Sequence, residues 1–312
     1  MQNKKEKKFI SIVLYLHNVR DEVLTFFQEI LPYFEERFEQ FEIIGVNDDC
    51  TDGTVEVLKE YLENRKISSM VNLVHMSFFH GMEGSMNAGR DLAIGDFVYE
   101  FDTIAMDYSK EMIEKAFEKV MDGYDIVGVR PQNNGSLSSR TFYFLYNKTS
   151  RGKGKIGTES FRILSRRAIN RVKSMGQYIP YRKAVYANCG LKTDFISYIP
   201  IKKVKKNGNR SERTSLALDS FIYFTDVLER FSMLLCVLFL CLSIGMGIYI
   251  IKDYFSGTSI VEGWLSTMGF LSLGFFGVFA LLTIMLKYLS VMLNLIFRHQ
   301  RYFIMEIEKV VK

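Results

Sequence analysis

Short apolar runs alternate with amphipathic stretches along the first hundred residues. Strands are expected at residues 9–16, 41–46, 71–76 and 96–101, because each is a brief, nearly continuous apolar run bounded by polar residues. Helices are expected at 21–38, 54–64 and 84–93. This alternation of apolar strands and helices predicts an α/β fold in which helices cover both faces of a mostly parallel sheet.

The pattern continues less regularly as far as residue 230. Helices are expected at 108–121, 139–146 and 165–174, and strands at 125–129 and 195–204. A further helix at 215–230 carries apolar residues at helical spacing among Asp219, Asp226 and Glu229. Such an amphipathic helix is typical of a membrane surface.

Two long uncharged runs follow. Phe231 to Ile251 comprises 21 residues and Trp264 to Leu286 comprises 23, and each is long enough to cross a hydrocarbon core of about 30 Å. Two buried core helices are the alternative, but soluble cores rarely keep such runs uncharged on every face. The runs therefore predict a transmembrane hairpin.

The distribution of basic residues orients this hairpin. Lysines and arginines gather before the first run and after the second, whereas the connection at 252–263 has one basic residue, Lys252. The positive-inside rule then places both ends in the cytoplasm of a cell-membrane protein with two spans. The expected order is a cytosolic domain at 1–214, an interfacial helix at 215–230, spans at 231–251 and 264–286 joined by an external loop at 252–263, and a cytosolic tail at 287–312.

The composition of the chain limits the classes of partner that it is expected to bind. The net charge is +5, with the basic residues near the uncharged runs, which favours anionic lipid headgroups over nucleic acid. The four cysteines lack metal-ligand spacing and are expected to be free thiols. Small residues in the runs, such as Gly245 and Gly274, allow close helix contacts in a homo-oligomer or within the hairpin.

The densest group of acids is Asp48, Asp49 and Asp52, directly after the strand at 41–46. Crowded carboxylates repel, so a sugar hydroxyl, a nucleobase donor or a metal ion is expected to satisfy them. The alternative is a polar turn that caps the helix at 54–64. Asn18, Asp48 and Asp102 each follow a strand. Since ligands bind beyond the carboxyl ends of parallel strands, these residues are expected to converge, which favours a ligand site.

Several segments together resemble one known family. Val46-Asn-Asp-Asp-Cys-Thr-Asp-Gly-Thr54 is similar to the signature Val-Asp-Asp-Gly-Ser-Thr-Asp-Gly-Thr, and the run from Gly84 to Asp102 resembles the helix, turn and strand that lead to an Asp-x-Asp motif. Gln300-Arg-Tyr-Phe-Ile304 follows the hairpin, as in that family. The chain thus resembles the family 2 glycosyltransferases with the GT-A fold, in particular the membrane-anchored, dolichol-phosphate mannosyltransferase-like polyprenyl-phosphate glycosyltransferases.

The resemblance implies roles for four donor-site residues. Asn18 would lie in the nucleotide pocket, Asp48 would face the base and ribose of a UDP- or GDP-linked sugar, and Asp52 would help to hold the loop. Asp102 matches the first acid of the Asp-x-Asp pair and would bring Mg²⁺ or Mn²⁺ to the diphosphate. Carboxylate and phosphate oxygens are the preferred ligands of such cations.

The chain departs from the family pattern at the metal motif. Thr103 and Ile104 follow Asp102, so the second acid of the pair is missing, and Asp107 lies five residues on. Asn47 replaces the first aspartate of the signature, and Tyr15 replaces a proline of the opening strand. Three outcomes are therefore open: weaker metal binding, metal binding that depends on substrate oxygens and water, or loss of the metal.

On the acceptor side, Glu159 is the candidate general base, and Arg140, Arg162 and Arg182 are candidates for binding an acceptor phosphate. The resemblance implies an inverting transfer of a sugar to a membrane polyprenyl phosphate for cell-envelope glycan synthesis. One alternative is a glycosyltransferase that extends another lipid-linked or envelope glycan. Another is a degenerate, non-catalytic homologue that binds nucleotide or lipid, for which the missing acid is the strongest argument.

Overall fold

The computed structural model describes residues 5–65, 67, 69–132, 137–149, 155–175, 181–201, 263–297 and 302–311, together with short pieces between 231 and 255. The chain divides into two compact units. The first combines Met1–Lys148, Gly152–Ala217 and Arg298–Lys312, and the second combines Thr149–Arg151 and Leu218–Phe297. The interfacial helix expected at 215–230 lies outside the described residues, as does most of the loop expected at 252–263.

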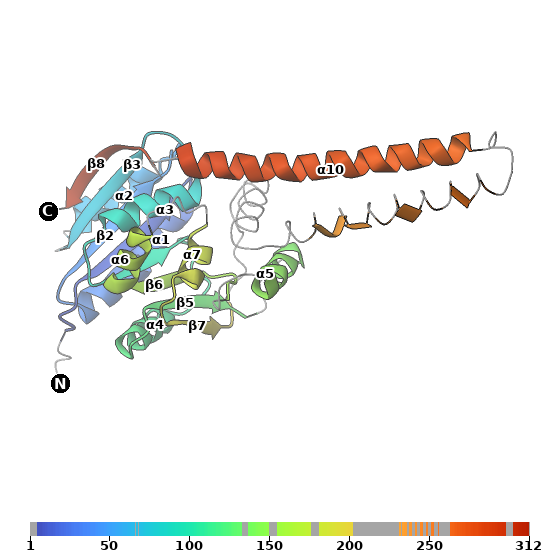
Figure 1. Ribbon diagram of the computed structural model, residues 1–312. Helices are drawn as coiled ribbons and strands as arrows, with labels where there is room; N and C mark the ends of the chain where they lie inside the picture. The colour runs from blue at the N-terminus through green and yellow to red at the C-terminus, as the bar shows by residue number, and fades with distance from the viewer. Residues whose placement is uncertain are drawn as a thin grey trace. The chain divides into compact units, whose positions relative to one another are not determined.

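The first unit is built on a mixed sheet of eight strands (Figure 1). In chain order the strands are β1 (Ile10–Leu16), β2 (Phe41–Asn47), β3 (Met70–Met76), β4 (Phe97–Phe101), β5 (Ile126–Pro131), β6 (Phe161–Ser165), β7 (Thr193–Tyr198) and β8 (Ile304–Val311). Their order in the sheet is β7-β5-β6-β4-β1-β2-β3-β8. The run β4-β1-β2-β3 is parallel, whereas β6 and β8 pair antiparallel to their neighbours.

Helices cover both faces of this sheet, as the alternating pattern predicted. They are α1 (Arg20–Arg37), α2 (Thr54–Arg65), α3 (Gly81–Leu92), α4 (Glu111–Met121), α5 (Leu137–Thr149), α6 (Arg166–Ser174) and α7 (Arg182–Asn188). Alternate residues of β1 face opposite layers: Ile12 belongs to the core shared with α1, α2 and α4, whereas Val13 meets Gly89 of α3. A Cβ at Gly89 would lie 2.5 Å from Val13, so a larger residue there would push α3 off the sheet.

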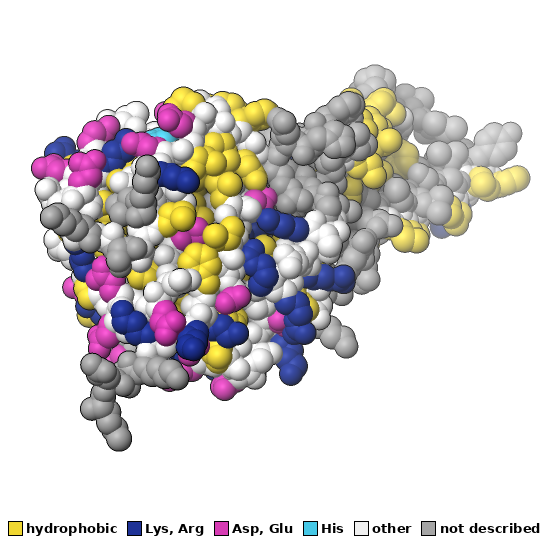
Figure 2. Space-filling view, turned by 90° about the vertical axis from the view of Figure 1, so that its left-hand side faces the viewer, with side chains coloured by type: hydrophobic (Ala, Val, Ile, Leu, Met, Phe, Trp, Pro, Cys, Tyr) yellow, Lys and Arg dark blue, Asp and Glu magenta, His cyan; other side chains and the backbone are white. Residues whose placement is uncertain are grey.

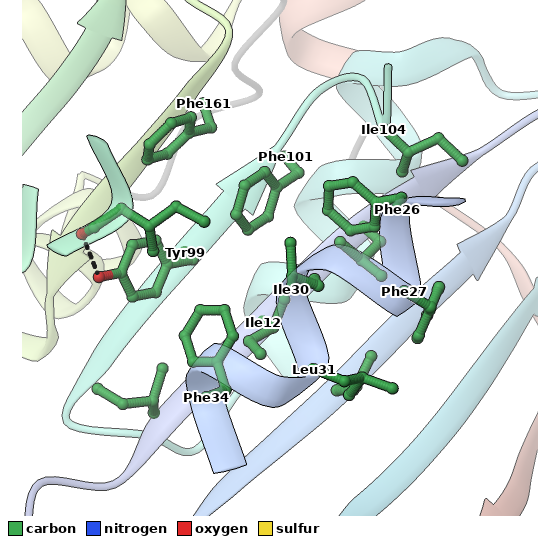
Figure 3. Close-up of a cluster of buried hydrophobic side chains, with 14 of the residues drawn as sticks. Ile12, Phe26, Phe27, Ile30, Leu31, Phe34, Tyr99, Phe101, Ile104 and Phe161 are labelled. Carbon is green, nitrogen blue, oxygen red and sulfur yellow. Dashed lines mark hydrogen bonds between the residues drawn. The ribbon is translucent and has the colours of Figure 1, made fainter. Parts of the chain in front are cut away.

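Aromatic side chains dominate the core between the sheet and α1 (Figure 3). The rings of Phe26 and Phe101 meet edge to face, with centroids 5.2 Å apart, and Phe34 packs against Tyr99 in the same way at 5.3 Å. The buried Tyr99 hydroxyl donates to the backbone oxygen of Ile113 at 3.0 Å. Each such ring contributes roughly 1.5–3 kcal/mol through burial. The core therefore fixes the position of β4, whose end carries Asp102.

The expected strands and helices of the first 130 residues are confirmed within a few residues. Three elements were not predicted: β6, α7 and β8. The five-residue β6 carries Arg162 at its second position, and an arginine is not typical of a central strand. The strand β8 lies in the segment expected to be a membrane-proximal tail, and it pairs with β3 in register from Val71↔Val311 to Met76↔Ile304.

The second unit contains α10 (Trp264–Phe297). In the part of the chain that the structure describes, no helix combines the length and the apolarity needed to cross a membrane. The transmembrane hairpin expected from the uncharged runs therefore stays a prediction.

The surface of the first unit carries charges of both signs. On the face shown in Figure 2, lysine and arginine side chains (dark blue) are mixed with aspartate and glutamate (magenta), and hydrophobic side chains (yellow) gather among them.

Candidate donor-substrate site

The strands that lead to Asn18, Asp48 and Asp102 are neighbours. β1 pairs with β2 on one side and β4 on the other, with Leu16 beside Asn47 and Leu14 beside Phe101. Since all three strands are parallel, their carboxyl ends share one edge of the sheet. The described contacts divide this edge into two clusters: a hydrogen-bonded loop around Asp48 and an ionic cluster around Asp102.

Asp48 is fully buried and accepts hydrogen bonds from neutral groups. Its Oδ1 accepts from the backbone N–H of His80 at 2.7 Å, and its Oδ2 accepts from the Tyr15 hydroxyl at 3.0 Å. Its own backbone N–H donates to the oxygen of Leu16 at 2.9 Å, which continues the β1–β2 ladder. Asp48 therefore ties together β1, its own loop and the segment before α3.

Two residues beside Asp48 adopt the left-handed backbone conformation. Asn18 has φ 50° and Asp49 has φ 58°, values that asparagine and aspartate tolerate better than most residues. The Asn18 side-chain oxygen accepts from the backbone N–H of Thr51 at 2.8 Å. Such left-handed residues gather at binding and active sites, where the surrounding structure holds them.

Asp52 joins the starts of two helices. Its Oδ2 accepts from the backbone N–H of Arg20 at 3.0 Å, and its Oδ1 accepts from the backbone N–H and the hydroxyl of Thr54 at 3.0 and 2.5 Å. Partial burial would raise the pKa of Asp52, but these hydrogen bonds outweigh it and the pKa lies below its usual value. Asp52 thus does what the cap interpretation expected, while it also holds the loop.

Asp102 lies between two buried arginines. Arg162 Nη2 donates to Asp102 Oδ2 at 2.8 Å, and Arg182 Nη2 donates to Asp102 Oδ1 at 2.8 Å. Both arginines are fully buried. Burial alone would raise the pKa of Asp102, but the charges of Arg162, Arg182 and Lys183 outweigh it and hold the pKa well below its usual range. Asp102 is therefore a carboxylate whose charge is already compensated.

Further carboxylates complete the ionic cluster. Glu100 is fully buried, and its Oε2 accepts from Nη1 of Arg162 at 3.0 Å and from Nη1 of Arg182 at 2.9 Å. Glu83 accepts from Arg182 Nε at 2.9 Å, and Glu159 accepts from Arg162 Nε at 2.8 Å. Each nitrogen of both guanidinium groups therefore faces a carboxylate.

Comparison with known proteins identifies the family to which the chain belongs. The model of the family described as Glycosyl transferase family 2 matches residues 11–173, more than half of the chain. The chain belongs to this family. The match begins in β1 and ends in α6, so it contains both clusters except for the contribution of α7.

Curated relatives support the assignment at moderate identity. The chain is 25% identical over 269 residues to the Prophage bactoprenol glucosyl transferase homolog of Escherichia coli, which covers 83% of this chain and 86% of the relative. It is 28% identical over 203 residues to the Bactoprenol glucosyl transferase of Shigella phage SfV, and 28% identical over 196 residues to an uncharacterized glycosyltransferase of Synechocystis. Those alignments cover 62% and 61% of this chain, and 64% and 60% of the respective relatives.

Solved structures share the fold. A mannosyltransferase from Pyrobaculum calidifontis, in complex with GDP-Man and Mn²⁺, has a TM-score of 0.52 at 13% identity and covers 95% of this chain and 89% of its own. Glucosyl-3-phosphoglycerate synthase from Mycobacterium tuberculosis, with Mn²⁺, UDP and phosphoglyceric acid, has a TM-score of 0.51 at 12% identity and covers 69% of this chain and 76% of its own. The protein is thus a family 2 glycosyltransferase with a GT-A-like mixed sheet.

Two of the three arginines expected to bind an acceptor phosphate lie in the ionic cluster of this glycosyltransferase. Arg162 and Arg182 direct their guanidinium nitrogens at carboxylates, so a phosphate would have to displace those carboxylates to reach them. Arg140 is on α5, and its side chain is exposed. Glu159, the candidate base, is bonded to the same guanidinium as Asp102.

The residues around Asp102 do not fit a resident divalent cation. Both Asp102 oxygens already accept from arginines. The position of the family's second acid is Ile104, which is 2% exposed and packs in the aromatic core near Phe26 (Figure 3). Asp107 directs its carboxylate to the Tyr198 hydroxyl. The described residues contain no group of three or more His, Cys, Asp or Glu side chains placed to hold a metal ion.

A cavity of about 10 Å³ opens beside the ionic cluster. Its lining includes Lys155, Glu159, Arg162, Lys183 and Tyr186. This volume has room for about one water molecule. A nucleotide sugar can therefore enter this side of the cluster only when side chains of the lining move.

Sequence reasoning missed several residues of the two clusters. Glu100 precedes Asp102 by two positions, and in a strand such residues share a face, so the alternation carried a signal for it. Tyr15 and His80 had no signal, because they contact Asp48 across 33 and 32 residues. The sequence also carried no signal for Glu83, Lys183 or Tyr186.

Proposed function

We propose that this glycosyltransferase moves a sugar from a nucleotide sugar to a polyprenyl phosphate held in a membrane. One observation carries the proposal: Asp48 and Asp102 follow the two parallel strands that flank β1, and Glu159 accepts from the guanidinium that holds Asp102, in a chain similar to a bactoprenol glucosyl transferase homolog along most of its length. In this fold ligands bind beyond the carboxyl ends of the strands. The donor would lie across that edge.

The two clusters suit two parts of a nucleotide sugar. We assign the base and ribose to the loop of Asn18, Asp48 and Asp52, where the acids accept hydrogen bonds from neutral groups. We assign the diphosphate and sugar to the neighbourhood of Asp102. Solved structures of the same fold hold GDP-Man or UDP, so GDP-linked and UDP-linked sugars are both candidate donors.

The acceptor and the membrane belong to the same proposal. The uncharged runs at 231–251 and 264–286 would form the hairpin anchor, with both ends and the catalytic unit in the cytoplasm. The anchor would hold the active site near the lipid headgroup and raise its effective concentration.

The reaction would be a direct displacement with inversion. A phosphate oxygen of the lipid forms a bond to the anomeric carbon while the bond from that carbon to the diphosphate breaks, and the nucleoside diphosphate leaves with the electron pair. An ionised phosphate needs no base, so Glu159 would orient the acceptor or serve as a base for a hydroxyl acceptor. Arg140 is the exposed cation among the proposed acceptor residues.

Non-catalytic binding of nucleotide or lipid is the second candidate, because Ile104 replaces the second acid and Asp102 is already paired. Full-length protein in nanodiscs is incubated with undecaprenyl phosphate or a lipid-linked glycan and with labelled UDP- and GDP-sugars. Label on undecaprenyl phosphate that disappears in Asp48→Ala supports the proposal, and label on the glycan alone supports chain extension. Nucleotide binding without transfer to either acceptor would contradict both enzymatic assignments.

A further inference from the structure

Two buried arginines hold the carboxylates of the ionic cluster in place. Arg162 and Arg182 each bridge Glu100 and Asp102 through their two terminal nitrogens, at distances of 2.8 to 3.0 Å. Loss of either arginine would leave buried carboxylates without a compensating positive charge, which is strongly unfavourable. These guanidinium groups are therefore permanent parts of the site.

A divalent cation would compete with these arginines for Asp102. Mg²⁺ and Mn²⁺ bind hard anionic oxygens and need several of them. Here both oxygens of the one matching acid already accept hydrogen bonds from cations, and the second position is an isoleucine in the core. A metal ion could therefore bind Asp102 only by displacing an arginine from it.

Lys183 is the cation of this cluster with donors to spare. Its side chain is 8% exposed, and Nζ lies 3.9 Å from Asp102 Oδ2, beyond hydrogen-bond distance. It also lines the cavity beside the cluster. An ammonium carries three donors on a flexible stem. Of the cluster's described cations, Lys183 is therefore the one that can turn toward an anionic ligand while both arginines keep their partners.

We propose that this glycosyltransferase binds the diphosphate of its donor without a divalent cation, with Arg162 and Arg182 fixing Asp102 and Lys183 contacting the diphosphate. The inference rests on the proposed function, because it concerns the donor of that reaction. Arg162 and Arg182 act as positioning residues, and Lys183 acts as the binding residue.

The first experiment measures metal and nucleotide binding to the full-length protein in detergent. In isothermal titration calorimetry with Mn²⁺ alone, the wild type is expected to bind no more metal than the Asp102→Asn variant does. UDP and GDP are then titrated in a buffer with EDTA and in a buffer with Mn²⁺. For each nucleotide that binds, the affinities in the two buffers are expected to agree within about twofold. A gain of about tenfold or more with Mn²⁺, absent in Asp102→Asn, would overturn the inference.

The same titrations separate this inference from the proposed function. Binding of UDP or GDP only in Mn²⁺ overturns the metal-free site and leaves the proposed transferase intact. Binding of neither nucleotide in either buffer overturns both. Sugar transfer that persists in EDTA supports both.

The second experiment tests Lys183. Lys183→Met is expected to weaken nucleoside diphosphate binding in EDTA by about 10- to 100-fold, as the loss of a charged hydrogen bond predicts. Lys183→Arg is expected to restore most of it. Lys173→Met is the matched control, because Lys173 is a partly exposed lysine bonded to the backbone oxygen of Asp91. Unchanged affinity in a folded Lys183→Met protein would overturn the role of Lys183.

Discussion

Asp48 and Asp102 are buried at the ends of strands on either side of β1, yet their surroundings differ in kind. Asp48 accepts hydrogen bonds from a backbone N–H and a tyrosine hydroxyl. Asp102 accepts from two arginines and has a lysine 3.9 Å away. The first carboxylate is held by dipoles and the second by full charges.

The difference shows that a carboxylate at a strand end does not by itself indicate a metal site. What matters is which groups already compensate its charge. At Asp102 two arginines and a lysine surround the carboxylate, and both of its oxygens accept hydrogen bonds from the arginines, so a metal ion would have to compete with those cations. At Asp48 no described cation lies within salt-bridge distance, so the loop keeps an uncompensated acceptor that suits donors of a neutral ligand.

The largest expected effect comes from removing a shared cation. Arg182→Met leaves Glu83, Glu100 and Asp102 with a missing partner in a buried site. We expect a loss of about 3–5 kcal/mol in the free energy of unfolding, because an uncompensated buried charge is that costly. Urea unfolding followed by near-ultraviolet circular dichroism measures it.

Lys110→Met provides the matched control. Lys110 pairs with Glu29, and the two side chains are 47% and 49% exposed, so its loss is expected to destabilise the protein far less than Arg182→Met does. Equal destabilisation by both variants would show that burial does not distinguish the Asp102 cluster from a surface ion pair.

A smaller effect is expected in the pH dependence of stability. The pKa of folded Asp102 lies well below its ordinary value of 3.8, so its contribution is present above that pH and is lost as the pH falls below it. Asp102→Asn cannot titrate. The wild type is therefore expected to lose about 2 kcal/mol more than the variant on acidification from pH 5 to pH 2. Parallel curves for the two proteins would contradict this.

Much of the fold could be predicted because its signals are local. Apolar runs gave β1 to β4, and helical periodicity gave the helices between them, since both patterns repeat within a few residues. The shared edge of Asn18, Asp48 and Asp102 followed from the parallel order of those strands. Predictions that depend on neighbouring residues or on regular topology therefore held.

The ionic cluster could not be predicted in the same way. Arg182 meets Glu83 across 99 residues and Glu100 across 82, and no local pattern links such partners. In the sequence these arginines stand far from their carboxylate partners, which belong to other elements. The arginines therefore suggested contacts with phosphate. The strand β8 was missed for the same reason: its partner β3 lies more than 200 residues earlier.

The smallest expected effect concerns the Asp48 loop. Tyr15→Phe removes the hydroxyl that donates to Asp48 Oδ2, and the ring stays in place. We expect a loss of about 1 kcal/mol in the free energy of unfolding, since a neutral hydrogen bond contributes about that much. Tyr124→Phe, at a partly buried tyrosine outside both clusters, is the control in the same urea titration. A loss for Tyr15→Phe as large as that for Arg182→Met would mean that Asp48 depends on its partners as strongly as Asp102 does, and the distinction between dipolar and charged support would fail.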